Sequence, residues 1–265
     1  MAQPADGRGD RVGYRVAGQV ATITLQRPEK LNAMDRRGFA ALEAAAGRAA
    51  ADPGIRAVVV TGAGRAFCTG VDAAELAAVA DLDQAERYLA EVQRAIEAVE
   101  RLPKPVIAAV NGLAGGGGLQ LALACDLRLA AASAQFAAWE MRWAIVPDLA
   151  GARRLPQLVG LGRAKELVFT GRQVDAGEAQ RIGLANRVVA DELLAAEAAE
   201  LAAGLAAGPT LALGLAKQAL DAAFGQPDEA ALAARQAQRR TLASADHAEA
   251  RAAYTERRSP RFGGA

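Results

Sequence analysis

The stretch NGLAGGGGLQLALACD, residues 111–126, decides how this chain folds. It follows the apolar run VIAAV at 106–110, which predicts a buried strand, and its second half has the pattern of a helix from Leu119 to Ala124. Four consecutive glycines, 115–118, therefore stand between a strand and a helix. At such a position free backbone N–H groups and the positive end of the helix dipole point outward, which predicts a site for an anion or an oxyanion.

Two nucleotide-binding patterns do not fit the same glycines. No lysine followed by serine or threonine completes a phosphate loop, and a dinucleotide pattern would need its last glycine where Gln120 or Leu121 stands. A flexible turn without any binding role stays open as the structural alternative.

Strand-like and helical segments alternate on either side of the glycine run. Short β-branched or continuously apolar runs predict strands, and the longer alanine-rich runs predict helices, one of them capped by Asp35. The predicted strands are 11–16 and 19–26, joined as a hairpin at Ala17-Gly18, then 57–62, 106–110 and 127–129. The predicted helices before residue 130 are 35–51, 81–101 and 119–124. This order predicts an α/β fold with a parallel sheet covered by helices.

The chain changes character after about residue 190, where it becomes alanine-rich and helical in pattern. Breaks at Gly208-Pro209 and at Gly225-Gln226-Pro227 divide this part into three or four helices. We therefore predict a core domain over residues 11–190 and a helical region over 191–265. Alanine-rich helix faces allow close approach, so these helices suit a cap on the core or contacts with neighbouring subunits.

Composition excludes several classes of protein. The 31 basic and 30 acidic residues give a net charge of +1, which predicts no global attraction to nucleic acid or to an anionic membrane. The sequence contains no run of about eighteen apolar residues, so it predicts no membrane span. The N-terminus lacks a secretory pattern and Cys68 and Cys125 make no disulfide framework, so we expect a cytoplasmic protein.

The single histidine, His247, lies in the polar stretch SADHAEAR. A nucleophile activated by histidine would depend on this residue alone, and a zinc site would have to be built mostly from carboxylates. The sequence therefore favours neither class. We expect His247 on the surface of an amphipathic helix.

The segment PVIAAVNGLAGGGGLQLALACDLRLA, residues 105–130, resembles the signature of the crotonase family of enoyl-CoA hydratases and isomerases. Blocks at 25–35, 58–76 and 145–160 resemble that family in order and spacing, and the likeness extends to the terminal RAAYTERRSPRF. The resemblance implies a crotonase-like ββα spiral core followed by a C-terminal helical oligomerisation region. It also implies a homotrimer or a dimer of trimers, that is, a homohexamer.

The resemblance implies a reaction of acyl-CoA thioesters. A thioester carbonyl becomes an enolate when a proton leaves or a nucleophile adds in conjugation, and two preorganised N–H groups stabilise its oxygen. By family position these donors are the backbone groups of Val71 and Gly117. Coenzyme A is then part of the substrate, and neither a metal nor a redox cofactor is implied.

Family position also assigns the groups that move protons. Hydratases of the family carry a glutamate three residues after the second oxyanion donor, where this chain has Gln120, whose amide exchanges no proton near neutral pH. The second glutamate slot is filled by Glu140. Asp148 stands where the family commonly has glycine. A carboxylate at this position resembles the double-bond and ring isomerases of the family. We therefore predict double-bond isomerisation ahead of hydration, with Glu140 and Asp148 moving the proton.

Three other functions stay open. The first is a hydratase that uses Glu140 and Asp148 as acid and base, and the second is a non-catalytic acyl-CoA-binding protein. The third is a dehalogenase or thioester hydrolase with Asp148 as nucleophile, although the dehalogenases of the family carry tryptophan at the Glu140 slot. The structural alternatives are a helix N-cap for Asp148 and a salt bridge for Glu140 with Arg142, Arg153 or Arg154.

Further residues are implied in substrate binding by family position. Arg27, Lys30 and Arg257 are basic groups suited to the phosphates of coenzyme A, a plain surface charge being the alternative for Arg257. The thiol of Cys68 is expected to be packed and not reactive, since only Arg65 is nearby in sequence to lower its pKa. The other implied contacts are Cys68, Gly70, Asp72, Gly116, Gln120 and Trp139.

Overall fold

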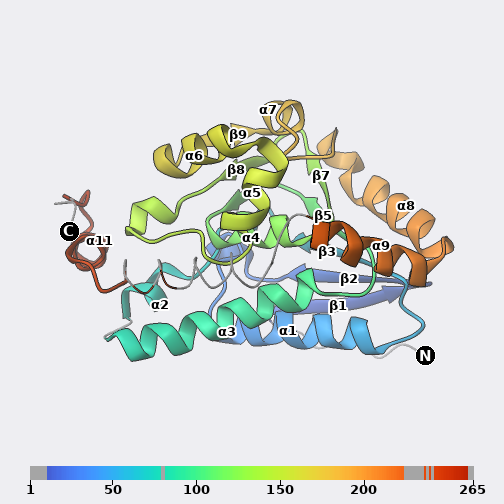
Figure 1. Cartoon of the computed structure of the whole chain (residues 1–265), viewed down its shortest axis with the longest axis horizontal. Coiled ribbons are helices and arrows are strands. Elements are labelled where there is room, and N and C mark those ends of the chain that lie inside the picture. Colours follow the sequence, from blue (N-terminus) through green and yellow to red (C-terminus); the bar gives the residue numbers. More distant parts are fainter. Residues whose placement is uncertain (1–10, 79–80, 224–235, 237–238, 240–241, 262–265) are drawn as a thin grey trace.

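The computed structural model describes residues 11–78, 81–223, 236, 239 and 242–261. Its centre is a six-stranded sheet in the order β1-β2-β3-β5-β7-β10 (Figure 1). The strands are β1 (Val12–Ala17), β2 (Val20–Leu25), β3 (Ala57–Gly62), β5 (Val106–Val110), β7 (Leu127–Ala131) and β10 (Arg187–Val189). β1 and β2 form the predicted antiparallel hairpin, and the remaining neighbours are parallel, as predicted.

A second, four-stranded sheet has the order β4-β6-β8-β9. Its strands are β4 (Ala66–Cys68), β6 (Leu113–Gly115), β8 (Gln135–Ala137) and β9 (Gln173–Asp175). The strands β3, β5 and β7 are each followed by one strand of this second sheet and then by helical structure. The chain therefore winds as repeated strand–strand–helix units, which confirms the predicted ββα spiral. The sequence did not reveal β4 or β6, because three residues are too few for a periodic pattern.

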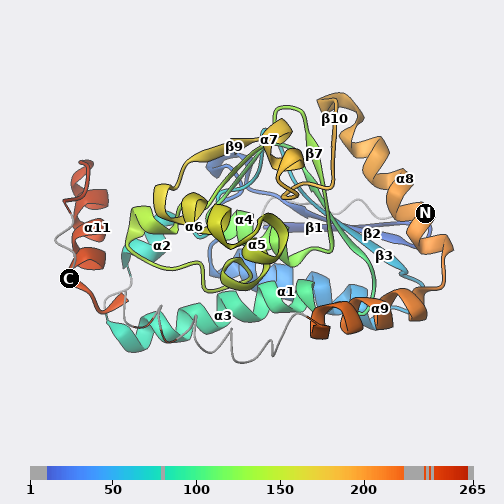
Figure 2. The same ribbon diagram turned by 45° about the horizontal axis from the view of Figure 1, so that its top comes forward.

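The helices are arranged around the sheets and are drawn in Figures 1 and 2. They are α1 (Arg36–Ala51), α2 (Ala73–Ala78), α3 (Leu82–Glu100), α4 (Gly117–Ala124), α5 (Gly151–Val159), α6 (Leu161–Thr170), α7 (Ala176–Arg181), α8 (Leu194–Ala207), α9 (Thr210–Ala223) and α11 (Ala245–Glu256), with short 3₁₀ turns η1 (Pro28–Lys30), η2 (Glu140–Trp143) and η3 (Asp191–Leu193). Asp35 accepts a hydrogen bond from Gly38 N at 2.8 Å and caps α1, as predicted. α1 and α3 lie side by side, and α8 packs against β3 and β5.

Only helical structure follows β10 in the part of the chain that the structure describes. The predicted break at Gly208-Pro209 separates α8 from α9, whereas the predicted break at 225–227 lies outside the described residues. One face of α8 is buried against the sheet through Leu194 and three alanines. The division into domains 11–190 and 191–265 stays a prediction.

His247 lies on a helix, α11, but the prediction of a surface position is wrong. The residue is 2% exposed, and its Nδ1 lies 2.8 Å from the carbonyl oxygen of Trp143 in η2. Trp143 and Tyr254 also meet across this contact, with ring centroids 5.1 Å apart. Burial lowers the pKa of His247. The polar sequence of α11 did not show which face would pack, because the partner surface is distant in the chain.

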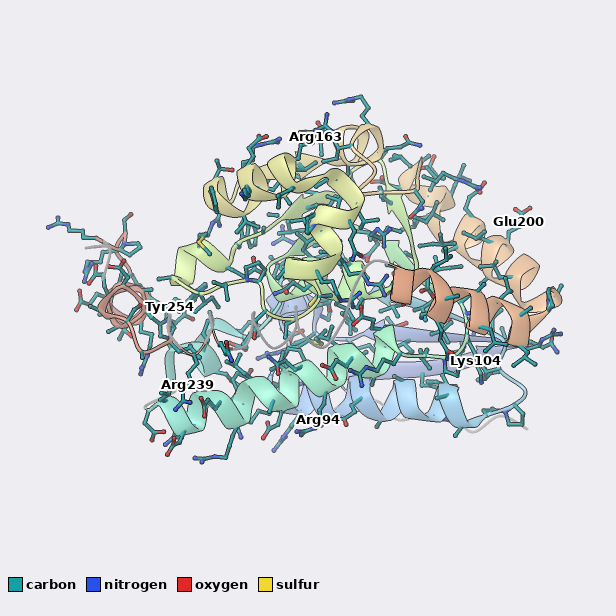
Figure 3. The ribbon with its side chains drawn as sticks, viewed as in Figure 1. Arg94, Lys104, Arg163, Glu200, Arg239 and Tyr254 are labelled. Atoms are coloured by element: carbon teal, nitrogen blue, oxygen red, sulfur yellow. The ribbon has the colours of Figure 1, made fainter. Side chains whose placement is uncertain are left out.

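Charged side chains such as Arg94, Arg163 and Glu200 point outward from the molecule (Figure 3). Among the described residues no single helix is long and apolar enough to cross a membrane, while the segments Asp191–Ala207 and Thr210–Asp221, bent by 102°, reach that length and composition only as a pair.

Candidate active site

Two loops from different turns of the spiral meet at the start of α4. β4 and β6 pair in parallel, so the loop after β4 and the glycine run after β6 leave the second sheet side by side. A methyl group built on Gly117 would lie 3.6 Å from the Val71 nitrogen, and one built on Gly70 would lie 2.6 Å from the Gly117 nitrogen. The two N–H groups that family position selects as donors are therefore close neighbours.

Among the described residues, the surrounding backbone accepts no hydrogen bond from either N–H group. Gly117 is the first residue of α4, so its N–H belongs to the turn that has no acceptor within the helix. Val71 pairs with Met34 in an isolated β-bridge. The two hydrogen bonds of this bridge run from the Met34 nitrogen to the Gly70 oxygen, at 2.7 Å, and from the Asp72 nitrogen to the Met34 oxygen, at 2.9 Å. Neither bond uses the Val71 nitrogen. This geometry suits a carbonyl oxygen that gains negative charge.

The glycine run is needed because the backbones approach closely. Gly116 has φ +51° and Gly70 has φ +91°, which glycine adopts without strain. A methyl group on Gly118 would lie 2.0 Å from the Cys68 oxygen. The run is therefore a close-packed junction and not the flexible turn that was the alternative, and α4 begins two residues before the predicted start.

A cavity of about 170 Å³ opens at these N–H groups. Seven of its lining residues are ones that family position selects, while the rest of the wall contains apolar and aromatic side chains such as Leu76, Leu89 and Trp143. The selected residues are Val71, Gly116, Gly117, Gln120, Trp139, Glu140 and Asp148.

Gln120 is held in one orientation by hydrogen bonds from both directions. Its amide oxygen accepts from the backbone nitrogens of Leu149 and Gly151, at 2.9 and 3.0 Å, at the start of α5. Its amide nitrogen donates to Glu140 Oε1 at 2.8 Å. Gln120 thus joins α4, the start of α5 and η2, and it has no proton to exchange with the substrate.

Glu140 is a buried carboxyl group in the wall of the cavity. The residue is 4% exposed, and its Oε2 has no hydrogen-bond partner among the described residues. Burial, with the charge of Asp148 acting in the same direction, raises the pKa of Glu140 to about 7. The predicted alternative, a salt bridge, is wrong for the described residues, because Arg153 and Arg154 pair with Glu100 and Arg142 lies over the Trp139 ring.

Asp148 lies in the same cavity wall and is 6% exposed. Its Oδ2 accepts a hydrogen bond from Gln93 Nε2 on α3 at 3.0 Å. The alternative prediction of a helix N-cap is wrong, because α5 begins at Gly151 and Ala150 occupies the N-cap position. The backbone N–H groups of Leu149 and Gly151, near the start of this helix, donate to the amide oxygen of Gln120 instead.

The other selected residues do not line this cavity. Arg27 donates to Asp72 Oδ2 at 2.5 Å and so ties the loop after β4 to the N-terminal part of the chain. Lys30 is exposed at the end of η1, and Arg257 is exposed at the end of α11. Their contacts with coenzyme A stay predictions.

Cys68 is fully buried and is not among the residues that line the cavity. Its Sγ lies 3.2 Å from the Asn32 oxygen and 3.3 Å from the Gly70 nitrogen, and burial raises the pKa of this thiol to about 12. The packed position expected for this thiol is confirmed, while a substrate contact at Cys68 stays a prediction.

Sequence inspection missed the residues that α3 contributes to the site. Gln93 contacts Asp148, and Tyr88 and Leu89 line the cavity. The only local signal was a glutamine near the apolar face of a helix, and nothing in the sequence placed that face opposite Asp148.

Glu140→Gln is expected to stabilise the protein above neutral pH but not in mild acid. The pKa of Glu140 in the folded protein, about 7, lies above its ordinary value of 4.5. Folding therefore favours the protonated carboxyl group, and this contribution to the free energy of unfolding is fully present below pH 4.5 and is lost as the pH rises through 7. Glutamine removes this loss, which amounts to about 3 kcal/mol at full burial. Thermal unfolding at about pH 5 and about pH 8 checks it. The exposed Glu200→Gln serves as the control, and an equal change in Tm at both pH values would contradict the prediction.

Comparison with known proteins agrees with this geometry. A sequence profile described as enoyl-CoA hydratase/isomerase matches residues 15–265. The chain is 39% identical over 253 residues to the putative enoyl-CoA hydratase/isomerase YngF of Bacillus subtilis, covering 94% of this chain and 97% of the relative. It is also 39% identical over 252 residues to the 1,2-epoxyphenylacetyl-CoA isomerase of Escherichia coli, covering 92% and 95%.

A solved structure gives the same result for the fold. An enoyl-CoA hydratase from Mycobacterium avium subsp. paratuberculosis superposes with a TM-score of 0.84 at 30% identity, covering 95% of this chain and 98% of the other. The fold and these relatives define an enzyme of the crotonase class. The chain belongs to the enoyl-CoA hydratase/isomerase family.

Proposed function

We propose that this enzyme moves a double bond in enoyl-CoA thioesters by proton transfer. The observation that carries the proposal is the composition of the cavity wall, in which the carboxyl groups of Glu140 and Asp148 accompany the paired N–H groups, while Gln120 presents a fixed amide. The two carboxyl groups can then exchange protons with the acyl chain, and the amide cannot.

The proposed reaction begins with the thioester oxygen at the N–H groups of Val71 and Gly117. For a 2-enoyl thioester, ionised Asp148 removes a proton from C4, and the electron pair spreads through the double bond onto the thioester oxygen. Protonated Glu140 then donates its proton to C2, which leaves a 3-enoyl thioester and exchanges the charges of the two carboxyl groups. The reverse direction uses the same steps, and the reaction as proposed calls for neither a metal nor a redox cofactor.

Hydration is the second candidate, and the relatives give it specific support. The superposed mycobacterial structure is named an enoyl-CoA hydratase, and a relative 35% identical to this chain is named a short-chain-enoyl-CoA hydratase. In a hydratase the unpartnered Oε2 of Glu140 would bind the attacking water. Both reactions deliver solvent hydrogen to C2, but only the reversible isomerisation exchanges hydrogen at C4, so one experiment separates them.

Incubation with 2-hexenoyl-CoA in D₂O is expected to give deuterium at C4 without an equal yield of a 3-hydroxy product. Asp148→Asn should lower C4 exchange about 10²-fold, because an amide cannot remove the proton, while any hydration falls less. Mass spectrometry and NMR of the thioester measure both products. Deuterium confined to C2 of a 3-hydroxyacyl thioester, with none at C4, would replace the isomerase by the hydratase.

Gln120→Glu provides the complementary variant in the same experiment. One oxygen of the new side chain can still accept from Leu149 and Gly151, whereas the other would face Glu140 at about the present 2.8 Å. Two carboxyl groups at that distance share one proton. We expect hydration to rise relative to C4 exchange, and an unchanged ratio would show that position 120 does not select the reaction.

We also propose an acyl-CoA thioester as the substrate and a homotrimer or dimer of trimers as the assembly. The large side chains of Leu211, Leu215 and Leu220 are 77%, 55% and 65% exposed on α9, which supports an apolar contact with another subunit. A cytoplasmic location stays a prediction.

A further inference from the structure

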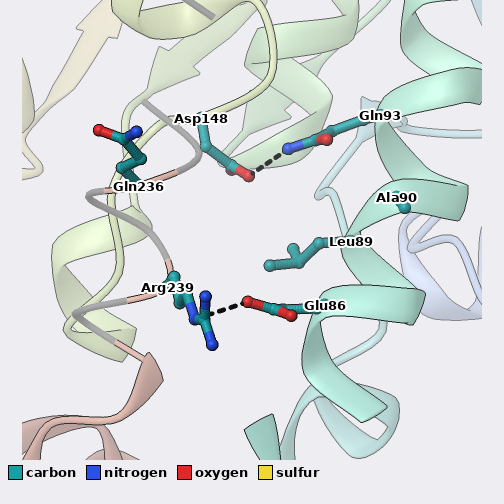
Figure 4. A pocket seen from close by; sticks show the side chains of 7 residues that line it. All are labelled: Glu86, Leu89, Ala90, Gln93, Asp148, Gln236 and Arg239. Atoms are coloured by element: carbon teal, nitrogen blue, oxygen red, sulfur yellow. Dashed lines mark hydrogen bonds and ion pairs between the residues drawn. The ribbon is translucent and has the colours of Figure 1, made fainter. Parts of the chain in front are cut away.

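A glutamine on α3 contacts the carboxyl group of Asp148 across a gap of 55 residues in the sequence. Gln93 Nε2 lies 3.0 Å from Asp148 Oδ2, and Figure 4 shows the two side chains extended toward one another. Asp148 is 6% exposed, so this hydrogen bond forms in a site largely shielded from water. A hydrogen bond donated to a carboxylate is stronger than one between neutral groups and favours the ionised form.

Gln93 belongs to the wall of a chamber of about 300 Å³ beside the active-site cavity. On α3 this wall is formed by Glu86, Leu89, Ala90 and Gln93, which share one helix face by their spacing. Leu89 and Asp148 line both the chamber and the active-site cavity. Asp148 thus lies where the two spaces adjoin, and Gln93 approaches it from the chamber side.

We propose that Gln93 is a positioning residue that holds the Asp148 carboxylate ionised and oriented for proton removal from the acyl chain. The inference rests on the proposed function of Asp148 and adds the group that prepares it. An amide is suited to this role, because it donates without titrating and without adding a charge to the chamber.

The charged groups around Asp148 make such a donor useful. Glu140 faces it within the active-site cavity, and the charge of Asp148 is one of the causes that raise the pKa of Glu140. Glu86 and Arg239 face the chamber, where Arg239 Nε pairs with Glu86 Oε1 at 2.8 Å (Figure 4). A hydrogen bond donated by Gln93 therefore favours the distribution in which Glu140 is protonated and Asp148 carries the charge. Burial of Glu140, which raises its pKa to about 7, favours the same distribution.

The test measures C4 deuterium exchange of 2-hexenoyl-CoA as a function of pH. Gln93→Met keeps the length of the side chain and removes the donor, so the acid limb of the exchange profile should move up by about one pH unit. Gln93→Glu places a second carboxylate against Asp148 and should move the acid limb of the exchange profile further up in pH. KM should change less than about twofold, because the role lies in proton removal and not in binding.

The same helix offers a matched control. Gln84 Nε2 donates to Asp81 Oδ2 at 2.9 Å at the exposed start of α3, so Gln84→Met removes a glutamine–aspartate bond outside the cavity. This variant should leave the pH profile in place. In an Asp148→Asn background, Gln93→Met should cause no further loss of exchange.

Each outcome decides the proposal. A shifted acid limb in both Gln93 variants, absent from Gln84→Met and from the Asp148→Asn background, supports it. If Asp148→Asn lowers exchange but Gln93→Met behaves as Gln84→Met at every pH, only the role of Gln93 is overturned. If Asp148→Asn leaves exchange intact, the proposed function of Asp148 fails and the role of Gln93 fails with it.

Discussion

Glu140→Gln is expected to lower kcat for enoyl-CoA thioesters about 10³-fold while acyl-CoA affinity stays within about twofold. Glu140 is buried beside the paired N–H groups, and a pKa of about 7 lets it exchange a proton near neutral pH. Glutamine has nearly the same shape and can still accept the hydrogen bond from Gln120, so the cavity keeps its form. Steady-state kinetics, with calorimetry on a saturated acyl-CoA that cannot react, measure the two effects separately.

The exposed Glu200→Gln on α8 makes the same chemical change far from the cavity wall and should leave kcat unchanged. Turnover by Glu140→Gln within about tenfold of the parent enzyme would remove Glu140 from the proton-transfer step. Joint loss of turnover and of acyl-CoA binding would instead assign it to the shape of the site.

Gly117→Pro is expected to lower kcat about 10²-fold or more without preventing folding. Proline removes the N–H that would stabilise the enolate oxygen. It is tolerated at the first position of a helix, where the N–H has no acceptor within the helix, and Gly117 occupies that position in α4. Kinetics with an enoyl-CoA thioester, and circular dichroism for the fold, check the result.

Gly117→Ala is the matched control, because alanine keeps the N–H while adding a methyl group 3.3 Å from Gly70 Cα. The alanine variant should retain at least about tenfold more turnover than the proline variant. Equal losses in the two variants would mean that crowding, and not the missing donor, lowers the rate.

The sequence by itself determined the family and most of the main sheet of this protein. Apolar runs such as 57–62 and 106–110 are long enough to show a buried strand, and Asp35 marks the start of α1 because its side chain caps the helix locally. The resemblance of the blocks at 58–76 and 105–130 to the family also selected Val71 and Gly117, since those assignments depend on position along the chain.

Only the tertiary structure decided the contacts between distant segments. It placed Gln93 of α3 against Asp148, buried His247 against Trp143, and turned the amide of Gln120 between Glu140 and the start of α5. Each contact joins residues between 20 and 104 positions apart. Propensity and periodicity act over a few turns of chain, so they determine which segments form helices and strands. Which polar side chains meet inside the protein depends on how those segments pack.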